Sequence, residues 1–235
     1  MAAFASLQAE TDANARVLQT LAHLPEGGGY STTSEASAKL RAAVSVSGRD
    51  LVLMPGRAMP SYCSGATYLV FLNAVRPNLT PEAAAVLADL RKADGHGVWG
   101  RWNANGPGTA RLFHELGLGK NFTDLNDARP GDFLKIFWRD AVGKHEFGHS
   151  VIFLGTETKD GEPHLRFWSS NKPEGYGEKS VPLSKMKRLL FSRLEHPERI
   201  ALVPKLPEKD AYLASLLTTE SSFAEALQKS GVKSR

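Results

Sequence analysis

Apolar residues recur at helical spacing through the first part of the chain. Residues 3–24 carry Leu and Val near one face of a predicted amphipathic helix, and residues 34–45 could form a second. Leu51-Val52-Leu53 is predicted to be a short strand or extended segment, and it ends at Pro55-Gly56. The sequence therefore favours a largely helical beginning.

The next segments strengthen this helical pattern. Residues 63–76 are apolar on every side, which is typical of a buried helix. A further helix is predicted over residues 80–91, because Thr80 suits an N-cap and Pro81 suits a first turn. Residues 95–108 are rich in Gly, Asn and Trp and are expected to form a loop before a short helix at 109–116.

The second half changes from helical spacing to short runs of aromatic and β-branched residues. These predicted strands cover residues 133–138, 150–154 and 165–168, and Asp160-Gly161 predicts a hairpin between the last two. Residues 208–229 return to an amphipathic helical pattern. Helices followed by antiparallel strands predict an α+β fold rather than alternating βαβ units.

Length and composition favour one large domain with helical additions. The chain has 235 residues, of which 42% are apolar, enough for one sizeable core. We expect residues 1–48 to form a helical segment packed on the domain. Residues 49–205 would form the central domain, and residues 206–235 a C-terminal helix.

The charge and the apolar pattern exclude several classes of protein. The net charge is only +4, no run of Lys and Arg exceeds two residues, and no motif for reading nucleic acid is present. No apolar stretch is long enough to span a membrane. We expect a monomer. The small residues at the start resemble the tail of an export signal, which favours a periplasmic or secreted protein.

The single cysteine is the first candidate for chemistry. Cys63 lies at the start of the predicted buried helix, where free N–H groups and the helix dipole favour a thiolate and could stabilise an oxyanion. Its neighbours Tyr62 and Ser64 are candidates to contact the oxyanion or the substrate, and Tyr30 is a weaker candidate of the same kind. The alternative is a buried cysteine without chemistry.

A nucleophilic thiolate needs a base and a group that orients the base. His149 opens the predicted strand at 150–154, and imidazole titrates near neutral pH. The hairpin would return the end of the following strand close to His149. Asn171 is therefore the preferred orienting residue and Ser169 the second choice, although Asn171 could also simply begin a turn.

These motifs, in this order, resemble the NlpC-type cell-wall peptidases and the related CHAP amidases. The matching segments are Cys63-Ser64-Gly65, Arg129-Pro130-Gly131-Asp132 and the strand 149–155. The resemblance implies a papain-like fold and cleavage of a peptide or amide bond, with peptidoglycan stem peptides as the expected substrate and no cofactor. Tyr62 replaces the family's usual Asp, and Asn171 fits the CHAP and papain pattern better than the NlpC-type His.

Two alternatives belong to other classes. His145-Glu146-Phe147-Gly148-His149 matches H-E-x-x-H, which on a helix would bind zinc with Glu146 as general base. Glycines at 143 and 148 and the strand-like residues that follow disfavour a helix there, and His164 is only a distant third ligand. The second alternative is a non-catalytic module that binds the cell wall.

The loop at 95–108 offers further candidates for substrate contact. Trp99, Trp102, Asn103 and Asn105 could line a groove, since aromatic faces and amide side chains suit glycans and peptides. The competing interpretation is an ordered loop whose tryptophans pack against the protein.

Overall fold

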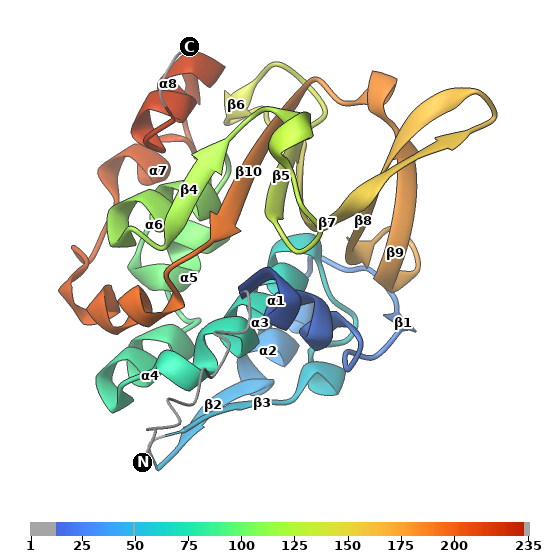
Figure 1. Ribbon diagram of the computed structural model, residues 1–235. Helices are drawn as coiled ribbons and strands as arrows, with labels where there is room; N and C mark the ends of the chain where they lie inside the picture. The colour runs from blue at the N-terminus through green and yellow to red at the C-terminus, as the bar shows by residue number, and fades with distance from the viewer. Residues whose placement is uncertain (1–12, 49, 233–235) are drawn as a thin grey trace, which may run out of the picture.

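The computed structural model describes residues 13–48 and 50–232, and it has an α+β fold (Figure 1). A seven-stranded antiparallel sheet has the order β1-β9-β8-β7-β5-β10-β4. Its strands are β1 (Gly27–Gly28), β4 (Gly119–Phe122), β5 (Phe133–Phe137), β7 (Gly148–Lys159), β8 (Glu162–Asn171), β9 (Gly175–Pro182) and β10 (Arg188–Leu194). The predicted α+β class, with its antiparallel sheet, is confirmed.

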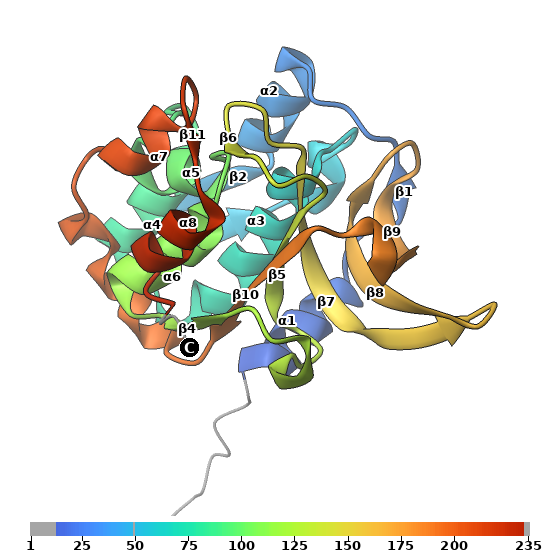
Figure 2. The same cartoon turned by 90° about the horizontal axis from the view of Figure 1, so that it is seen from above.

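The helices gather mainly on one side of this sheet. They are α1 (Ala13–Leu21), α2 (Ser34–Ala42), α3 (Cys63–Val75), α4 (Pro81–Ala88), α5 (Gly97–Trp102), α6 (Gly108–Leu116), α7 (Ala211–Ser215) and α8 (Phe223–Lys229). Seen from above, α3 lies between the strands and the helices α4, α5 and α6 (Figure 2). Short 3₁₀ helices occupy Pro55–Ala58, Arg76–Asn78, Leu125–Asp127, Leu183–Lys185 and Pro197–Lys205.

Helix α3 is the centre of the main core. Eleven of its 13 residues are buried, which explains why its sequence is apolar all round. One hydrophobic cluster joins α3 to residues as distant as Val17 and Val203. The N-terminal segment therefore shares its core with the central part of the chain, and β1 also adds a strand to the main sheet.

Several local predictions are confirmed by the backbone. The Thr80 side chain caps α4 by accepting a hydrogen bond from the N–H of Ala83 at 3.2 Å. Asp160 and Gly161 both have positive φ angles, 53° and 78°, as a tight β7–β8 hairpin requires. The predicted helix at 34–45 ends at Ala42, because Val44–Ser47 (β2) pairs with Asp50–Leu53 (β3). Part of the helix predicted over 3–24 lies outside the described residues.

The predicted C-terminal helix over 208–229 is wrong as a single element. The helix ends at Ser215, the last residue of α7, and Glu220–Ser221 (β11) then pairs with Val142–Gly143 (β6). Ser222 then caps α8, because its side chain accepts a hydrogen bond from the N–H of Glu225 at 3.1 Å. Ser and Thr favour caps and turns over helix interiors, and several of them lie between α7 and α8. The apolar residues on either side nevertheless keep a helical spacing, so the pattern predicted one continuous helix.

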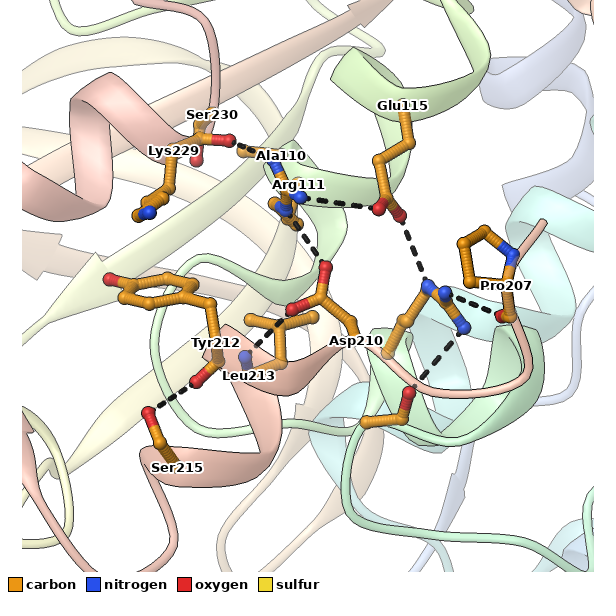
Figure 3. Close-up of polar contacts among 12 residues, drawn as sticks. Ala110, Arg111, Glu115, Pro207, Asp210, Tyr212, Leu213, Ser215, Lys229 and Ser230 are labelled. Atoms are coloured by element: carbon orange, nitrogen blue, oxygen red, sulfur yellow. Dashed lines mark hydrogen bonds and ion pairs between the residues drawn. The ribbon is translucent and has the colours of Figure 1, made fainter.

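An ion-pair network holds this C-terminal region against α6 (Figure 3). Arg111 donates to the Asp210 carboxylate at 2.8 Å and to the Lys229 carbonyl at 2.7 Å. It also contacts Glu115 at 3.3 Å. Asp210 in turn caps α7 by accepting from the N–H of Leu213 at 2.9 Å. One arginine therefore connects α6 to the beginning of α7 and the end of α8.

Candidate functional site

Cys63 is the first residue of α3, as expected, and its sulfur lies at a cleft. Tyr62 is the N-cap residue in an extended conformation, and its side chain makes no capping hydrogen bond. The first turn of α3 is thus left without a side-chain cap, and its N–H groups lie beside the thiol. Cys63 is only half-buried although nearly all of α3 around it is buried. A substrate can therefore reach it.

His149 lies close enough to Cys63 for its side chain to lower the pKa of the thiol. Pairing of His149 with Ile136 places the histidine at the start of β7. Its ring stacks on Trp138, with centroids 6.4 Å apart, and meets the edge of Phe167 at 5.6 Å. These two aromatic rings restrict the imidazole to one plane.

Asn171 lies at the end of β8 and bonds the other side of this imidazole. Its Oδ1 is 3.2 Å from His149 Nε2. The amide orientation follows from its neighbours, since Nδ2 donates to the carbonyl of Gly177 at 2.8 Å and that of Ser169 at 3.3 Å. Oδ1 must therefore accept, so His149 carries a proton on Nε2 and leaves Nδ1 for Cys63.

The surroundings of Cys63 favour its thiolate. Burial raises the pKa of the Cys63 thiol, but the hydrogen bond and charge of His149, the backbone N–H of Ser150 and the charge of Lys135 outweigh burial and lower the pKa from 9.0 to about 7. A substantial fraction of the sulfur is then ionised at neutral pH. That fraction is the nucleophilic form.

Tyr30, a weak candidate in the sequence, lies directly at the sulfur. Burial, together with the nearby Cys63 thiolate, raises the pKa of the Tyr30 hydroxyl to about 12. The hydroxyl therefore stays protonated and can donate. Backbone hydrogen bonds from Ser61 to Gly29 at 3.1 Å and from Ser31 to Ser61 at 2.9 Å hold the segment in place.

The two neighbours of Cys63 both lie near the cleft, and the hydroxyl group of each is hydrogen-bonded to another side chain. The Tyr62 hydroxyl lies 3.4 Å from Ser37 Oγ. The Ser64 hydroxyl donates to the side-chain oxygen of Asn103. Both residues line a cavity of about 330 Å³ that opens at Cys63. They can shape this cavity, which Tyr30 also lines.

The prediction that Trp99 and Trp102 contact substrate is wrong. Residues Gly97–Trp102 form helix α5 rather than a loop, and the two side chains are only 5% and 2% exposed. Trp102 stacks on Phe71 at 4.6 Å and donates from Nε1 to the Ser64 carbonyl at 3.2 Å. These tryptophans support the first turn of α3 from inside, and the cavity is lined instead by Asn103 and Asn105.

Ser169, the second choice for orienting the base, has another role. Its buried hydroxyl donates to the carbonyl of Ser150 at 2.7 Å and so joins β8 to β7. Asn171 is the residue that contacts His149. Of the two candidates, Asn171 is therefore the one placed to orient the imidazole.

The H-E-x-x-H segment lacks the helix that a zinc site of this kind requires. Strand β7 begins at Gly148, and His145 and His149 have separate partners, since His145 Nδ1 is 2.6 Å from Glu220. Over residues 13–48 and 50–232, no group of three His, Cys, Asp or Glu side chains could hold a metal ion. His164 bonds the Glu162 carbonyl at 3.0 Å and pairs with Glu157, far along β7.

Glu146 instead has a structural contact beside the cleft. Its carboxylate is 1% exposed and lies 2.6 Å from the ammonium group of Lys135 on β5. It also accepts hydrogen bonds from the N–H of Gly143, at 3.2 Å, and from the N–H of Gly106. The loop before β7 and the loop after α5 are thus joined to the sheet through one buried ion pair.

The Pro-Gly-Asp motif also has a structural role away from the sulfur. Asp132 is fully buried, and its two oxygens accept from Arg193 Nε at 2.8 Å and Nη2 at 2.7 Å. It also accepts from Asn14 on α1 at 2.8 Å and from the N–H of Arg129 at 2.8 Å. The motif therefore fixes the start of β5 against α1 and β10.

Comparisons with known proteins identify no relative of this chain. No protein-family model, curated protein or solved structure matches the chain. Among the described residues, no helix has both the length and the apolar character needed to cross a membrane. The geometry around Cys63 is therefore the basis for a functional proposal.

Proposed function

We propose that this protein is a cysteine peptidase or amidase in which Cys63 is the nucleophile, His149 the acid–base group and Asn171 its orienting residue. The observation that carries the proposal is the position of His149 between two groups: it lowers the pKa of Cys63, and it is hydrogen-bonded to Asn171 at 3.2 Å. The lowered thiol pKa supports it, because a thiolate near neutral pH is expected of a nucleophile and not of an inert buried cysteine.

The reaction would proceed through an acyl-enzyme. The Cys63 thiolate attacks a peptide or amide carbonyl, and the Cys63 N–H and the Tyr30 hydroxyl stabilise the oxyanion. Protonated His149 gives its Nδ1 proton to the leaving nitrogen as the C–N bond breaks. It then takes a proton from water, whose oxygen attacks the thioester and restores the thiolate. Asn171 keeps the imidazole oriented through both steps.

The order of the motifs suggests both the fold family and the substrate. A helix that carries the nucleophile at its N-terminus and packs on an antiparallel sheet is compatible with the papain-like architecture of NlpC-type and CHAP enzymes. That resemblance favours an amide bond in the peptide stems of bacterial peptidoglycan, and with it a periplasmic or secreted location. No metal or organic cofactor takes part in the proposed steps.

Digestion of purified peptidoglycan tests the proposal directly. Wild-type protein should release fragments whose masses identify one cleaved amide bond, while Cys63→Ala should release none. Iodoacetamide should abolish the activity, and a chelator should leave it unchanged. Equal cleavage by both proteins would refute the assignment, loss of activity with chelator would favour a metalloenzyme, and binding of both proteins without cleavage would favour a wall-binding module.

A further inference from the structure

Two neighbouring cavities are lined by residues of the Cys63–His149 site. The first, of about 330 Å³, is lined by Cys63, and the second, of about 380 Å³, is lined by His149 and Asn171. The two cavities adjoin, because Tyr30, Phe147 and Gly148 belong to both linings. A substrate that reaches the sulfur can therefore extend in two directions from its reacting carbonyl.

The proposed chemistry assigns a different part of the substrate to each cavity. The acyl group becomes bonded to the sulfur, so it must lie in the cavity that contains Cys63. The leaving amine must lie where His149 can protonate it, which is the second cavity. The lining of the second cavity therefore decides which amines the enzyme can release.

The first cavity has a polar lining. Hydroxyl and amide side chains predominate in it, together with the Lys135–Glu146 ion pair. The residues with these polar groups include Thr32, Ser37, Ser64, Asn103 and Asn105. Such a lining suits an acyl group that forms hydrogen bonds.

The second cavity has an apolar floor and a basic rim. Trp138, Phe147, Phe167 and Val181 supply the apolar surface. The rim carries Lys172 and Lys179, both exposed. This combination suits an apolar group that ends in a negative charge.

The positive charge at the rim is held close to the cavity. The ammonium group of Lys179 donates to the carbonyl of Lys172 at 3.1 Å, and the nearest acidic partner, Glu174, is 3.8 Å from it. Arg139 adds a third cation nearby by stacking over Phe147 at 4.2 Å from the ring centroid. The lining of the second cavity itself contains two lysines and no carboxylate.

We propose that the second cavity binds the amine side of the scissile amide, and that this amine carries an apolar side chain with a carboxylate beside it. The proposal rests on the cysteine amidase function above and names the leaving-group class for it. By microscopic reversibility, an amine of this class is also the best acceptor for the acyl-enzyme. Its nitrogen attacks the thioester, gives a proton to His149 and displaces the Cys63 thiolate.

Acyl transfer to added amines provides the test. Wild-type protein is acylated with a p-nitrophenyl ester, and intact mass and peptide mapping establish whether the adduct lies on Cys63. Amide and acid products are then measured with glycinamide, phenylalaninamide or phenylalanine as acceptor. We expect phenylalaninamide to capture the acyl group about ten- to a hundredfold better than glycinamide, because the aromatic side chain becomes buried in the cavity.

Reversing the charge of the two rim lysines tests whether the second cavity binds the carboxylate of the amine. Lys172→Glu and Lys179→Glu should each lower the preference for phenylalanine over phenylalaninamide about two- to fivefold, as expected for exposed charges. Lys159→Glu, at the exposed β7–β8 turn, is the matched control and should leave that ratio unchanged. Comparing each variant with wild type cancels the intrinsic reactivities of the two amines.

The outcomes separate this proposal from the one on which it rests. An adduct on Cys63 with no preference between phenylalaninamide and glycinamide overturns the leaving-group site and leaves the amidase proposal intact. Suppose that phenylalaninamide is preferred over glycinamide, but the ratio of phenylalanine to phenylalaninamide is unchanged in both lysine variants. The apolar part of the site then stands, and the proposed binding of a carboxylate is overturned. Absence of any adduct on Cys63 overturns both proposals.

Discussion

Asn171 Oδ1 lies 3.2 Å from His149 Nε2, and the same amide donates to two backbone carbonyls, of Ser169 on β8 and Gly177 on β9. The carbonyls fix the orientation of the amide, and the amide fixes the tautomer of the histidine. The backbone of the paired strands β8 and β9 thereby determines which imidazole nitrogen bonds Asn171 and which is left for Cys63.

Removing this amide should lower activity without removing the nucleophile. For Asn171→Ala we expect kcat/KM to fall about ten- to a hundredfold, the equivalent of one buried hydrogen bond. Steady-state hydrolysis measures this loss, and iodoacetamide labelling should show that Cys63 remains reactive. Ser169→Ala is a neighbouring control, whose hydroxyl bonds Ser150 and not His149. An equal loss in both variants would contradict a specific role for Asn171.

The reactivity of Cys63 should depend on pH with a midpoint near neutrality. The pKa of the thiol is lowered to about 7, so the rate of alkylation should rise as pH increases through about 7 and then level off. In His149→Ala the midpoint should move upward, because burial, which raises the pKa, then acts without the histidine. Rates of iodoacetamide labelling between pH 5 and about 10 measure both curves. An unchanged midpoint would show that His149 does not stabilise the thiolate.

The buried ion pair of Asp132 with Arg193 should be important for stability rather than chemistry. Asp132→Ala leaves a buried guanidinium without its carboxylate and should lower the free energy of unfolding by about 3–5 kcal/mol. The matched control is Asp140→Ala, which removes an exposed pair with Arg188 and should cost at most about 1 kcal/mol. Urea denaturation measures both. Similar values for the two variants would contradict the role assigned to Asp132.

Gly148 should be required for the wall of the cleft. A Cβ atom there would lie 2.7 Å from the ammonium nitrogen of Lys135 and would also collide with Glu146. Gly148→Ala should therefore displace the Lys135–Glu146 pair, with a loss of activity and a lower Tm. Gly56→Ala is the control, because a Cβ there meets no atom within 4 Å. Wild-type activity and Tm in Gly148→Ala would show that the pair can move freely.

The hairpin and the buried helix could be predicted because their signals are local. Asp160-Gly161 specifies a tight turn, and residues 63–75 are apolar on all sides. Strands β9 and β10 were not predicted, each for a different reason. Strand β9 lies towards the edge of the sheet and has a polar sequence, whereas β10 includes Arg193, whose charge pairs with Asp132, 61 positions earlier in the chain.

The sequence alone determined the fold class, the position of Cys63 at a helix start and the residue types suited to acid–base chemistry. Tertiary structure decided which of these residues meet: Tyr30 and His149 reach the sulfur, while Trp99 and Trp102 turn into the core. It also decided that Glu146 pairs with Lys135 instead of assisting a metal. Local periodicity specifies which face of an element is apolar, but the partner of a polar side chain depends on elements brought together only by folding.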